Sequence, residues 1–235
     1  MTNQNKSHAV MAQRSEAKDS LDNFPTPPWA TRALVEHVIE RGNARFLSSM
    51  SCLEPACGAG HMAKTLAEYF GTVSASDIYS YGYGKVENFL DRDENSEEFD
   101  WVITNPPFKY AEEFISKALK ISNRGVAMLV RTVFIESVGR YNRIFSKNPP
   151  QKFAQFSERV PMVKGRLDKK ASTATGYSWI VWEKNISPEP RLLWVPPCRK
   201  SLEREEDYLE DLSSGPVSEH YEASLKLEAT QKTMF

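Results

Sequence analysis

The sequence predicts an α/β fold in which a mostly parallel sheet carries helices on both faces. Within residues 46–70, an apolar stretch, a glycine turn and an apolar pattern at helical spacing follow one another. A second apolar run, residues 99–104, ends at two prolines that forbid a continuing strand ladder. Ligands of open α/β sheets bind at the carboxyl ends of strands, so both strand ends are predicted to face a binding site.

The glycine turn at residues 53–60 is the first predicted binding element. It reads Leu-Glu-Pro-Ala-Cys-Gly-Ala-Gly, and Gly58 and Gly60 would let the backbone pass close to a ligand. The helix that follows offers free N–H groups at its start. No third glycine follows at the spacing of the dinucleotide fingerprint, which disfavours NAD.

Further strands are predicted along the chain. Residues 72–78 form the second, with Asp77 about twenty residues beyond the glycine turn, where an acid binds a ribose diol. The alternative for Asp77 is a solvated aspartate that caps a turn. Residues 126–130 are the fifth strand and residues 177–182 the last. Residues 191–197 are either an edge strand or a covering segment.

The tetrapeptide Asn105-Pro106-Pro107-Phe108 follows the run 99–104 directly. The Asn105 side-chain oxygen and the Pro106 carbonyl could each accept one hydrogen of an exocyclic amine and make its nitrogen more electron-rich. Pro107 would keep the turn rigid, and Phe108 would offer a stacking face to a base. The alternative is an ordinary prolyl turn whose Phe108 caps a core.

Together these motifs resemble the class I S-adenosylmethionine-dependent methyltransferases, and within them the DNA N6-adenine methyltransferases with an Asn-Pro-Pro-Phe or Asn-Pro-Pro-Tyr motif. The resemblance covers residues 24–184 and includes Phe-Pro-Thr-Pro-Pro-Trp at 24–29, similar to the segment that closes over the methionine end of the cofactor. It implies a Rossmann-like fold with a seven-stranded, mostly parallel sheet whose last strand is antiparallel.

The resemblance implies S-adenosylmethionine as the cofactor. Its predicted ligands are Thr26, Glu54, Pro55, Ala56, Cys57, Gly58, Gly60, Asp77, Ile78, Asn88, Phe89, Leu90 and Asn105. The chain departs from the family pattern at Asn88, where members often carry an aspartate that accepts from the adenine amino group. An amide oxygen can accept the same hydrogen bond without charge assistance, so the departure affects affinity and not the reaction.

A basic stretch follows the predicted catalytic half. Residues 140–170 contain nine Lys or Arg against Glu158 and Asp168. Within it begins a polar segment, residues 163–173, which we call the basic loop and predict to be a mobile substrate loop. A solvated surface is the alternative. The predicted substrate-binding residues are Phe108, Arg131, Lys164, Arg166, Lys169 and Lys170.

Three parts are predicted: a disordered leader (1–21), a catalytic domain (22–198) and an acidic tail (199–235). Residues 201–228 contain nine Asp or Glu against two basic residues, which favours a flexible tail or an appended helix. No stretch is long enough for the separate target-recognition domain of larger family members. Specificity is therefore predicted to come from short loops, from a dimer or from a partner subunit.

Metal and membrane sites are not predicted. His8, His37, His61 and His220 are scattered, and the chain has three cysteines without zinc-ligand spacing. Without a signal peptide or long apolar span, the chain is expected to be cytoplasmic, in a bacterium or a phage-infected cell. Small solitary enzymes of the resembled family are frequent in phages and prophages.

The predicted function is methyl transfer from S-adenosylmethionine to the N6 amine of an adenine flipped out of duplex DNA. The same Asn-Pro acceptor pair also fits adenine in RNA or the side-chain amide of a protein glutamine. Protein-glutamine enzymes usually carry tyrosine in place of Phe108 and have a longer leader, which counts against them. A non-catalytic nucleic-acid-binding module is the third alternative.

Overall fold

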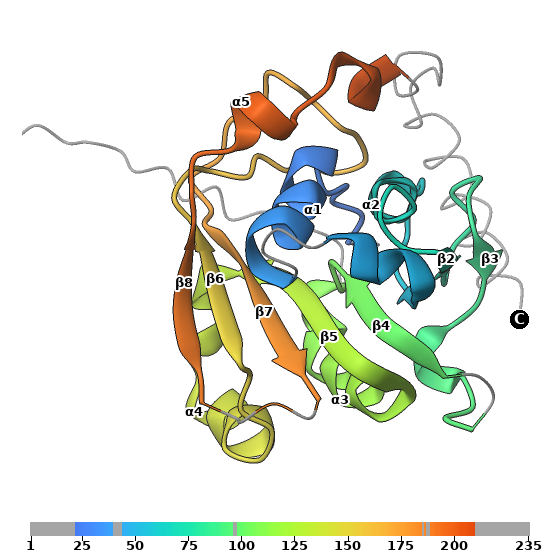
Figure 1. Cartoon of the computed structure of the whole chain (residues 1–235), viewed down its shortest axis with the longest axis vertical. Helices are drawn as coiled ribbons and strands as arrows, with labels where there is room; N and C mark the ends of the chain where they lie inside the picture. Colours follow the sequence, from blue (N-terminus) through green and yellow to red (C-terminus); the bar gives the residue numbers. More distant parts are fainter. Residues whose placement is uncertain (1–21, 40–43, 96–97, 185, 187–188, 210–235) are drawn as a thin grey trace, which may run out of the picture.

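The structure is a computed structural model that describes residues 22–39, 44–95, 98–184, 186 and 189–209 (Figure 1). The predicted leader and residues 210–235 of the predicted tail lie outside this part of the chain. The described residues form one eight-stranded sheet with the order β3-β2-β1-β4-β5-β7-β6-β8. Its strands are β1 (Ser51–Glu54), β2 (Thr72–Asp77), β3 (Lys85–Val86), β4 (Phe99–Thr104), β5 (Ser122–Arg131), β6 (Lys152–Phe156), β7 (Tyr177–Glu183) and β8 (Arg191–Val195).

The sheet is mostly parallel, and β7 is its antiparallel strand, paired with β5 and β6. The predicted α/β fold is confirmed, with one strand more than the seven predicted. The additional strand is β8, which pairs in parallel with β6 at the outer edge. The sequence left residues 191–197 open between an edge strand and a covering segment, because the prolines that end this stretch fit either one.

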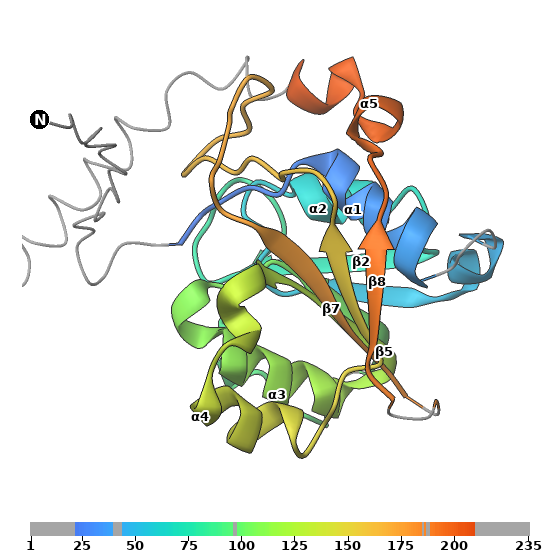
Figure 2. The same ribbon diagram turned by 90° about the vertical axis from the view of Figure 1, so that its left-hand side faces the viewer.

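Helices cover both faces of the sheet (Figure 2). The α-helices are α1 (Pro28–Leu34), α2 (His61–Leu66), α3 (Ala111–Ile121), α4 (Val138–Arg140) and α5 (Arg199–Leu202). The 3-10 helices are Ala44–Ser49, Phe89–Asp91, Phe108–Tyr110, Thr132–Ile135 and Glu205–Tyr208, and the π-helical turns are Val35–Ile39 and Tyr141–Phe145.

Two hydrophobic cores result, because β4 presents alternate side chains to the two faces. Trp101 and Ile103 pack into the core beneath α1 and α2, whereas Val102 packs into the core beneath α3. This explains why β4 carries three consecutive apolar residues, Trp101, Val102 and Ile103. Trp179 of β7 is fully buried and donates from Nε1 to the Ala30 carbonyl at 3.1 Å, which fastens α1 to the sheet.

Residues 199–209, the described part of the predicted acidic tail, pack against α1 and reach Glu68, which follows α2. Arg32 of α1 is 3% exposed and donates to Glu68 at 2.7 Å and to both carboxylate oxygens of Asp207 at 2.8 Å. A buried guanidinium needs such partners, since an unpaired buried charge is costly. None of the helices among the described residues is long and apolar enough to cross a membrane.

Candidate active site

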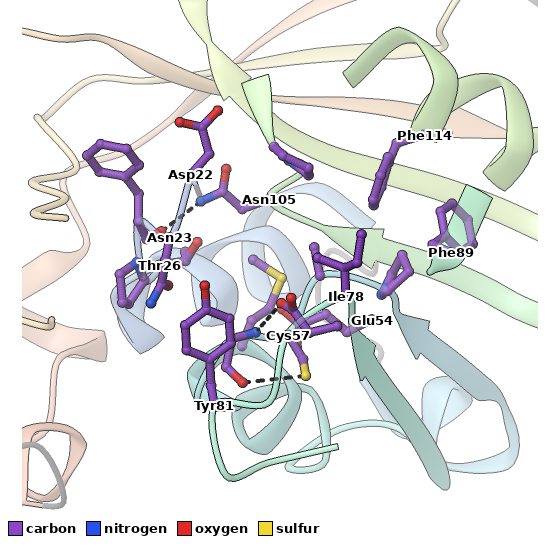
Figure 3. Close-up of a pocket in the computed structure, with 18 of the residues that line it drawn as sticks. Asp22, Asn23, Thr26, Glu54, Cys57, Ile78, Tyr81, Phe89, Asn105 and Phe114 are labelled. Atoms are coloured by element: carbon purple, nitrogen blue, oxygen red, sulfur yellow. Dashed lines mark hydrogen bonds between the residues drawn. The ribbon is translucent and has the colours of Figure 1, made fainter. Parts of the chain in front are cut away.

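A cavity of about 440 Å³ opens at the carboxyl edge of the sheet (Figure 3). Its walls come from the ends of β1, β2 and β4 and from residues 22–26, which precede α1. All predicted cofactor residues except Gly60 line it. The predicted catalytic residues Asn105 and Pro107 line it as well, whereas Pro106 and Phe108 lie outside the lining.

The glycine turn connects β1 to α2 through two residues in the left-handed region. Gly58 has φ 51° and Gly60 has φ 86°, conformations that side-chain-bearing residues rarely adopt. The Gly58 N–H donates to Asp77 Oδ2 at 2.8 Å, which joins the turn to the end of β2. A Cβ at Gly60 would lie 2.4 Å from the Tyr83 ring, so this glycine serves packing and not the cavity.

Two buried carboxyl groups stand at the strand ends. Glu54 ends β1 and is 2% exposed, and its Oε2 accepts no hydrogen bond from the described residues. Burial, with the charge of Asp77 adding to it, raises the Glu54 pKa well above its usual value. Burial also raises the pKa of Asp77, although both of its oxygens accept backbone N–H bonds, from Gly58 and Tyr79.

The lining is acidic in balance. It contains the carboxyl groups of Asp22, Glu54 and Asp77, and Lys109 is its one lysine or arginine among the described residues. Such a cavity favours a ligand with positive charge, because a cation compensates buried carboxylates. Cys57 also lines it, and burial raises the pKa of this thiol to about 12, which fits a packing role better than a reactive one.

Asn88 caps the short 3-10 helix Phe89–Asp91 at the cavity wall. Its Oδ1 accepts from the Leu90 N–H at 3.2 Å, and its Nδ2 donates to Asp91 at 2.7 Å. The oxygen therefore retains one lone pair for a ligand. The buried Phe89 ring packs on Phe114, with 4.9 Å between centroids, and completes an apolar wall.

Asn105 stands at the end of β4 with its amide held in one orientation (Figure 3). Its Nδ2 donates to the Phe24 carbonyl at 2.9 Å and lies 3.6 Å from Met162 Sδ. With the amino group engaged, Oδ1 is the part of the amide left to accept from a ligand. The Phe108 N–H donates to Asp22 at 3.0 Å and so ties residues 22–24 to the same turn.

The Phe108 ring is half-buried beside the cavity. It packs on Phe24, with 5.6 Å between centroids, and the Arg131 guanidinium lies 4.0 Å from its centroid. Arg131 ends β5, which pairs in parallel with β4, so both strands deliver their last residues to one edge. The structure thus brings Arg131, predicted as substrate-binding, to the Asn-Pro-Pro-Phe turn.

No family model and no curated protein matches this chain. Among solved structures it resembles the modification subunit of a proposed type I restriction enzyme from Vibrio vulnificus, with a TM-score of 0.54 and 18% identity. The match covers 84% of this chain and 53% of that one, so the chain spans about half the length of this relative. A proposed RNA methyltransferase from Pyrococcus horikoshii matches with a TM-score of 0.50 and 17% identity, over 72% of this chain and 90% of that one.

The chain has the Rossmann-like fold of class I methyltransferases. At these identities the likeness shows the fold alone. It confirms the predicted fold class and its antiparallel strand β7. The cavity described above lies at the edge where this type of fold binds its ligands.

The basic loop lies apart from the cavity. None of Lys164, Arg166, Lys169 and Lys170 lines it. Arg166 pairs with Asp168 at 3.3 Å, and Lys169 pairs with Glu205. The Gly165 N–H donates to the Asn23 carbonyl at 2.8 Å, so the loop is attached to the segment before α1. These residues remain predicted substrate ligands that would act outside the cavity.

Several lining residues were not predicted. They are Asp22, Asn23, His61, Met62, Tyr81, Lys109, Tyr110 and Phe114. Lys109 and Tyr110 directly follow Phe108, so their position in sequence was a usable signal. Met162, which contacts Asn105, carries no signal because it reaches the site from 57 residues away. No three His, Cys, Asp or Glu side chains gather in a metal-binding group within the described residues; His8 and His220 lie outside them.

Proposed function

We propose that this chain transfers a methyl group from S-adenosylmethionine to the N6 amine of adenine in DNA. The observation that carries the proposal is the orientation of Asn105. Its Nδ2 is engaged by Phe24, and its Oδ1 is left to accept one hydrogen of a planar amine at the cavity. An acceptor fixed in this way needs no reorganisation as positive charge develops on the amine.

The cavity fits S-adenosylmethionine by charge. The unpartnered Glu54 Oε2 is a buried acceptor suited to a cation such as the amino group of the cofactor's methionine end. Asp77 would accept from the ribose hydroxyls, and Asn88, Phe89 and Ile78 would surround the adenine. When bound, the cofactor supplies an electrophilic methyl group on a sulfonium, whose positive charge the acidic lining would also stabilise.

Catalysis would come from acceptors that bind more strongly as the amine becomes cationic. The Asn105 Oδ1 would accept one N6 hydrogen, and the Pro106 carbonyl would accept the other. Pro107 limits the turn to one shape, and the Asp22 contact to the Phe108 N–H holds it in place. The protein would thus orient the nitrogen for in-line attack without a metal or a general base.

Phe108 and Arg131 would bind the target base. A base that stacks on the Phe108 ring, on the side that Arg131 now covers, would displace the guanidinium towards the adjoining phosphate. The adenine must first leave its duplex stack to reach the cavity.

DNA is preferred over RNA and protein glutamine because of the Asn-Pro-Pro-Phe resemblance. The likeness to the Vibrio vulnificus modification subunit accords with this preference. A dimer or a partner subunit would supply sequence recognition, in line with the absence of a separate recognition domain between residues 22 and 209.

The test is transfer of labelled methyl to unmethylated plasmid DNA, with RNA and a glutamine-containing peptide in parallel and N6-methyladenine as the assayed product. Label in DNA that vanishes with Asn105→Ala supports the proposal. Label only in RNA, or only in the peptide, would show that RNA or protein glutamine is the substrate in place of DNA. No label in any, with cofactor still bound, would make the chain a binding module.

A further inference from the structure

Four large apolar side chains are exposed in one short stretch after β5. Val133 is 58% exposed, Ile135 43%, Val138 80% and Tyr141 60%. We call these four residues the apolar ridge. Single exposed apolar residues are ordinary on a protein surface, whereas several within residues 133–141 mark a contact surface.

The ridge is held rigidly from beneath. Phe134 lies between two ridge residues in the sequence but is buried, and it packs against Phe145 with 6.2 Å between ring centroids. Arg140 donates to the Phe134 carbonyl at 2.9 Å, and its guanidinium covers the Phe134 ring. A partner that binds this stretch would therefore lose little free energy to ordering it.

The base of the ridge is also tied to the sheet. The Thr132 N–H donates to the Gly176 carbonyl at 2.9 Å. The Thr132 hydroxyl oxygen lies 2.9 Å from the Ser178 hydroxyl oxygen. The backbone that carries the ridge is thus fixed to the sheet, while the four apolar side chains are exposed.

The ridge stands at the catalytic edge. Arg131, two residues before Val133, has its guanidinium 4.0 Å from the centroid of the Phe108 ring. Figure 2 shows the yellow-green turn after β5 beside the green start of α3, which follows the Asn-Pro-Pro-Phe turn in the chain. Whatever delivers a base to Phe108 must therefore come close to the ridge.

One arginine beside the ridge is left to meet an anion. Arg131 is exposed and forms an ion pair with no carboxylate among the described residues. Arg140 and Arg143 share Glu112, at 3.3 Å and 2.7 Å. Glu113 also acts on Arg143 through its charge, and Glu136 is an exposed carboxylate within the stretch. Arg131 is therefore the arginine left to meet a phosphate, and apolar side chains beside such an arginine match stacked bases beside a phosphate.

We propose that the apolar ridge is a wedge that enters the base stack of duplex DNA and holds it open while the target adenine occupies the cavity. The inference rests on the proposed function. Apolar side chains inserted between base steps are a known means of unstacking a duplex, and the cost falls when the target is already unpaired.

The experiment uses the whole chain and a short duplex centred on an adenine that it methylates in plasmid DNA. Single-turnover methylation is measured on this duplex and on one with an abasic site opposite the target. The test variant combines Ile135→Ala with Val138→Ala. Leu192→Ala is the matched control, because Leu192 is 60% exposed on the edge strand β8.

The double variant should lose roughly tenfold in rate on the paired duplex and less than about twofold on the duplex with the unpaired target. The control should change neither. Equal loss on both duplexes, or no loss on either, overturns the wedge. Unchanged rates together with a lost self-association in light scattering would make the ridge a protein interface and also overturn it. If no DNA is methylated by the native chain, the proposed function fails first, and the two failures are thereby distinguished.

Discussion

The two sides of the cavity mouth are held by different kinds of contact. On the glycine-turn side, β1 and β2 are parallel neighbours, and the 2.8 Å bond from the Gly58 N–H to Asp77 joins their ends directly. On the other side, the basic loop is attached to residues 22–26 through the Gly165 N–H and through Met162, which lies just before it. Its lysines and arginine lie outside the cavity. The proposed cofactor side is thus built on strand ends that pair directly, whereas the proposed substrate side reaches the cavity only through residues 22–26.

The variant Asn105→Ala tests the proposed division between catalytic and cofactor-binding residues and should have the largest effect. Removing the fixed acceptor should lower kcat by roughly 10²- to 10³-fold, because its contribution grows only as the amine becomes cationic. Cofactor affinity, measured by calorimetry, should stay nearly unchanged. If kcat and cofactor affinity fall together, Asn105 is a cofactor ligand and the catalytic role assigned to it is wrong.

Asp77→Ala should show the opposite pattern. Loss of a carboxylate that binds a ribose diol should weaken cofactor binding by about 10- to 100-fold, the value of a hydrogen bond to a charged group. At saturating cofactor, kcat should recover most of its native value. The Asn105→Ala protein is the matched control, since it alters the same cavity at another strand end. An unchanged dissociation constant would leave Asp77 with only its structural bonds to the Gly58 and Tyr79 N–H groups.

The strand, glycine turn and helix of the cofactor side were predictable from the sequence because they follow one another directly along the chain. Gly58 and Asp77 meet because a glycine turn and an acidic strand end recur at fixed places in this fold. Asp22 and Met162 reach Asn105 and its turn from distant segments, and no spacing rule places them. The basic loop was visible as a charge run, but the direction of its side chains depends on where residues 22–26 hold it. Strand β8 was ambiguous because its short apolar run ends at Pro196 and Pro197, which fit an edge strand or a covering segment alike.

The variant Glu54→Gln tests the role of Glu54 on the cofactor side through the pH dependence of stability and of cofactor affinity. Because burial raises the Glu54 pKa above its ordinary 4.5, the folded protein favours the protonated group. The stabilisation that the protonated Glu54 gives to the folded state is fully present below the ordinary pKa of a glutamate. It is lost as the pH rises through the raised pKa of the folded protein. A cationic ligand prefers the ionised carboxylate, so cofactor affinity should rise over the same interval.

The glutamine variant should flatten both pH dependences, as followed by thermal unfolding and by calorimetry. A residual slope would belong to Asp77, whose pKa burial also raises. A variant with the native pH dependence would show that Glu54 does not face the charged part of the ligand.

The smallest expected effect lies on the basic loop and decides whether that side contacts DNA at all. Lys170 is exposed, and Lys170→Ala should weaken DNA binding only a few-fold and reduce the slope of log affinity against log salt by about one. Lys169→Ala is the matched control, because Lys169 already pairs with Glu205 and should contribute less. Salt slopes that are unchanged in both variants would place the duplex on the ridge side of the cavity, where Arg131 would be its first phosphate contact. A loss in Lys170→Ala alone would instead mean that the duplex reaches the basic loop, so that DNA spans both sides of the cavity.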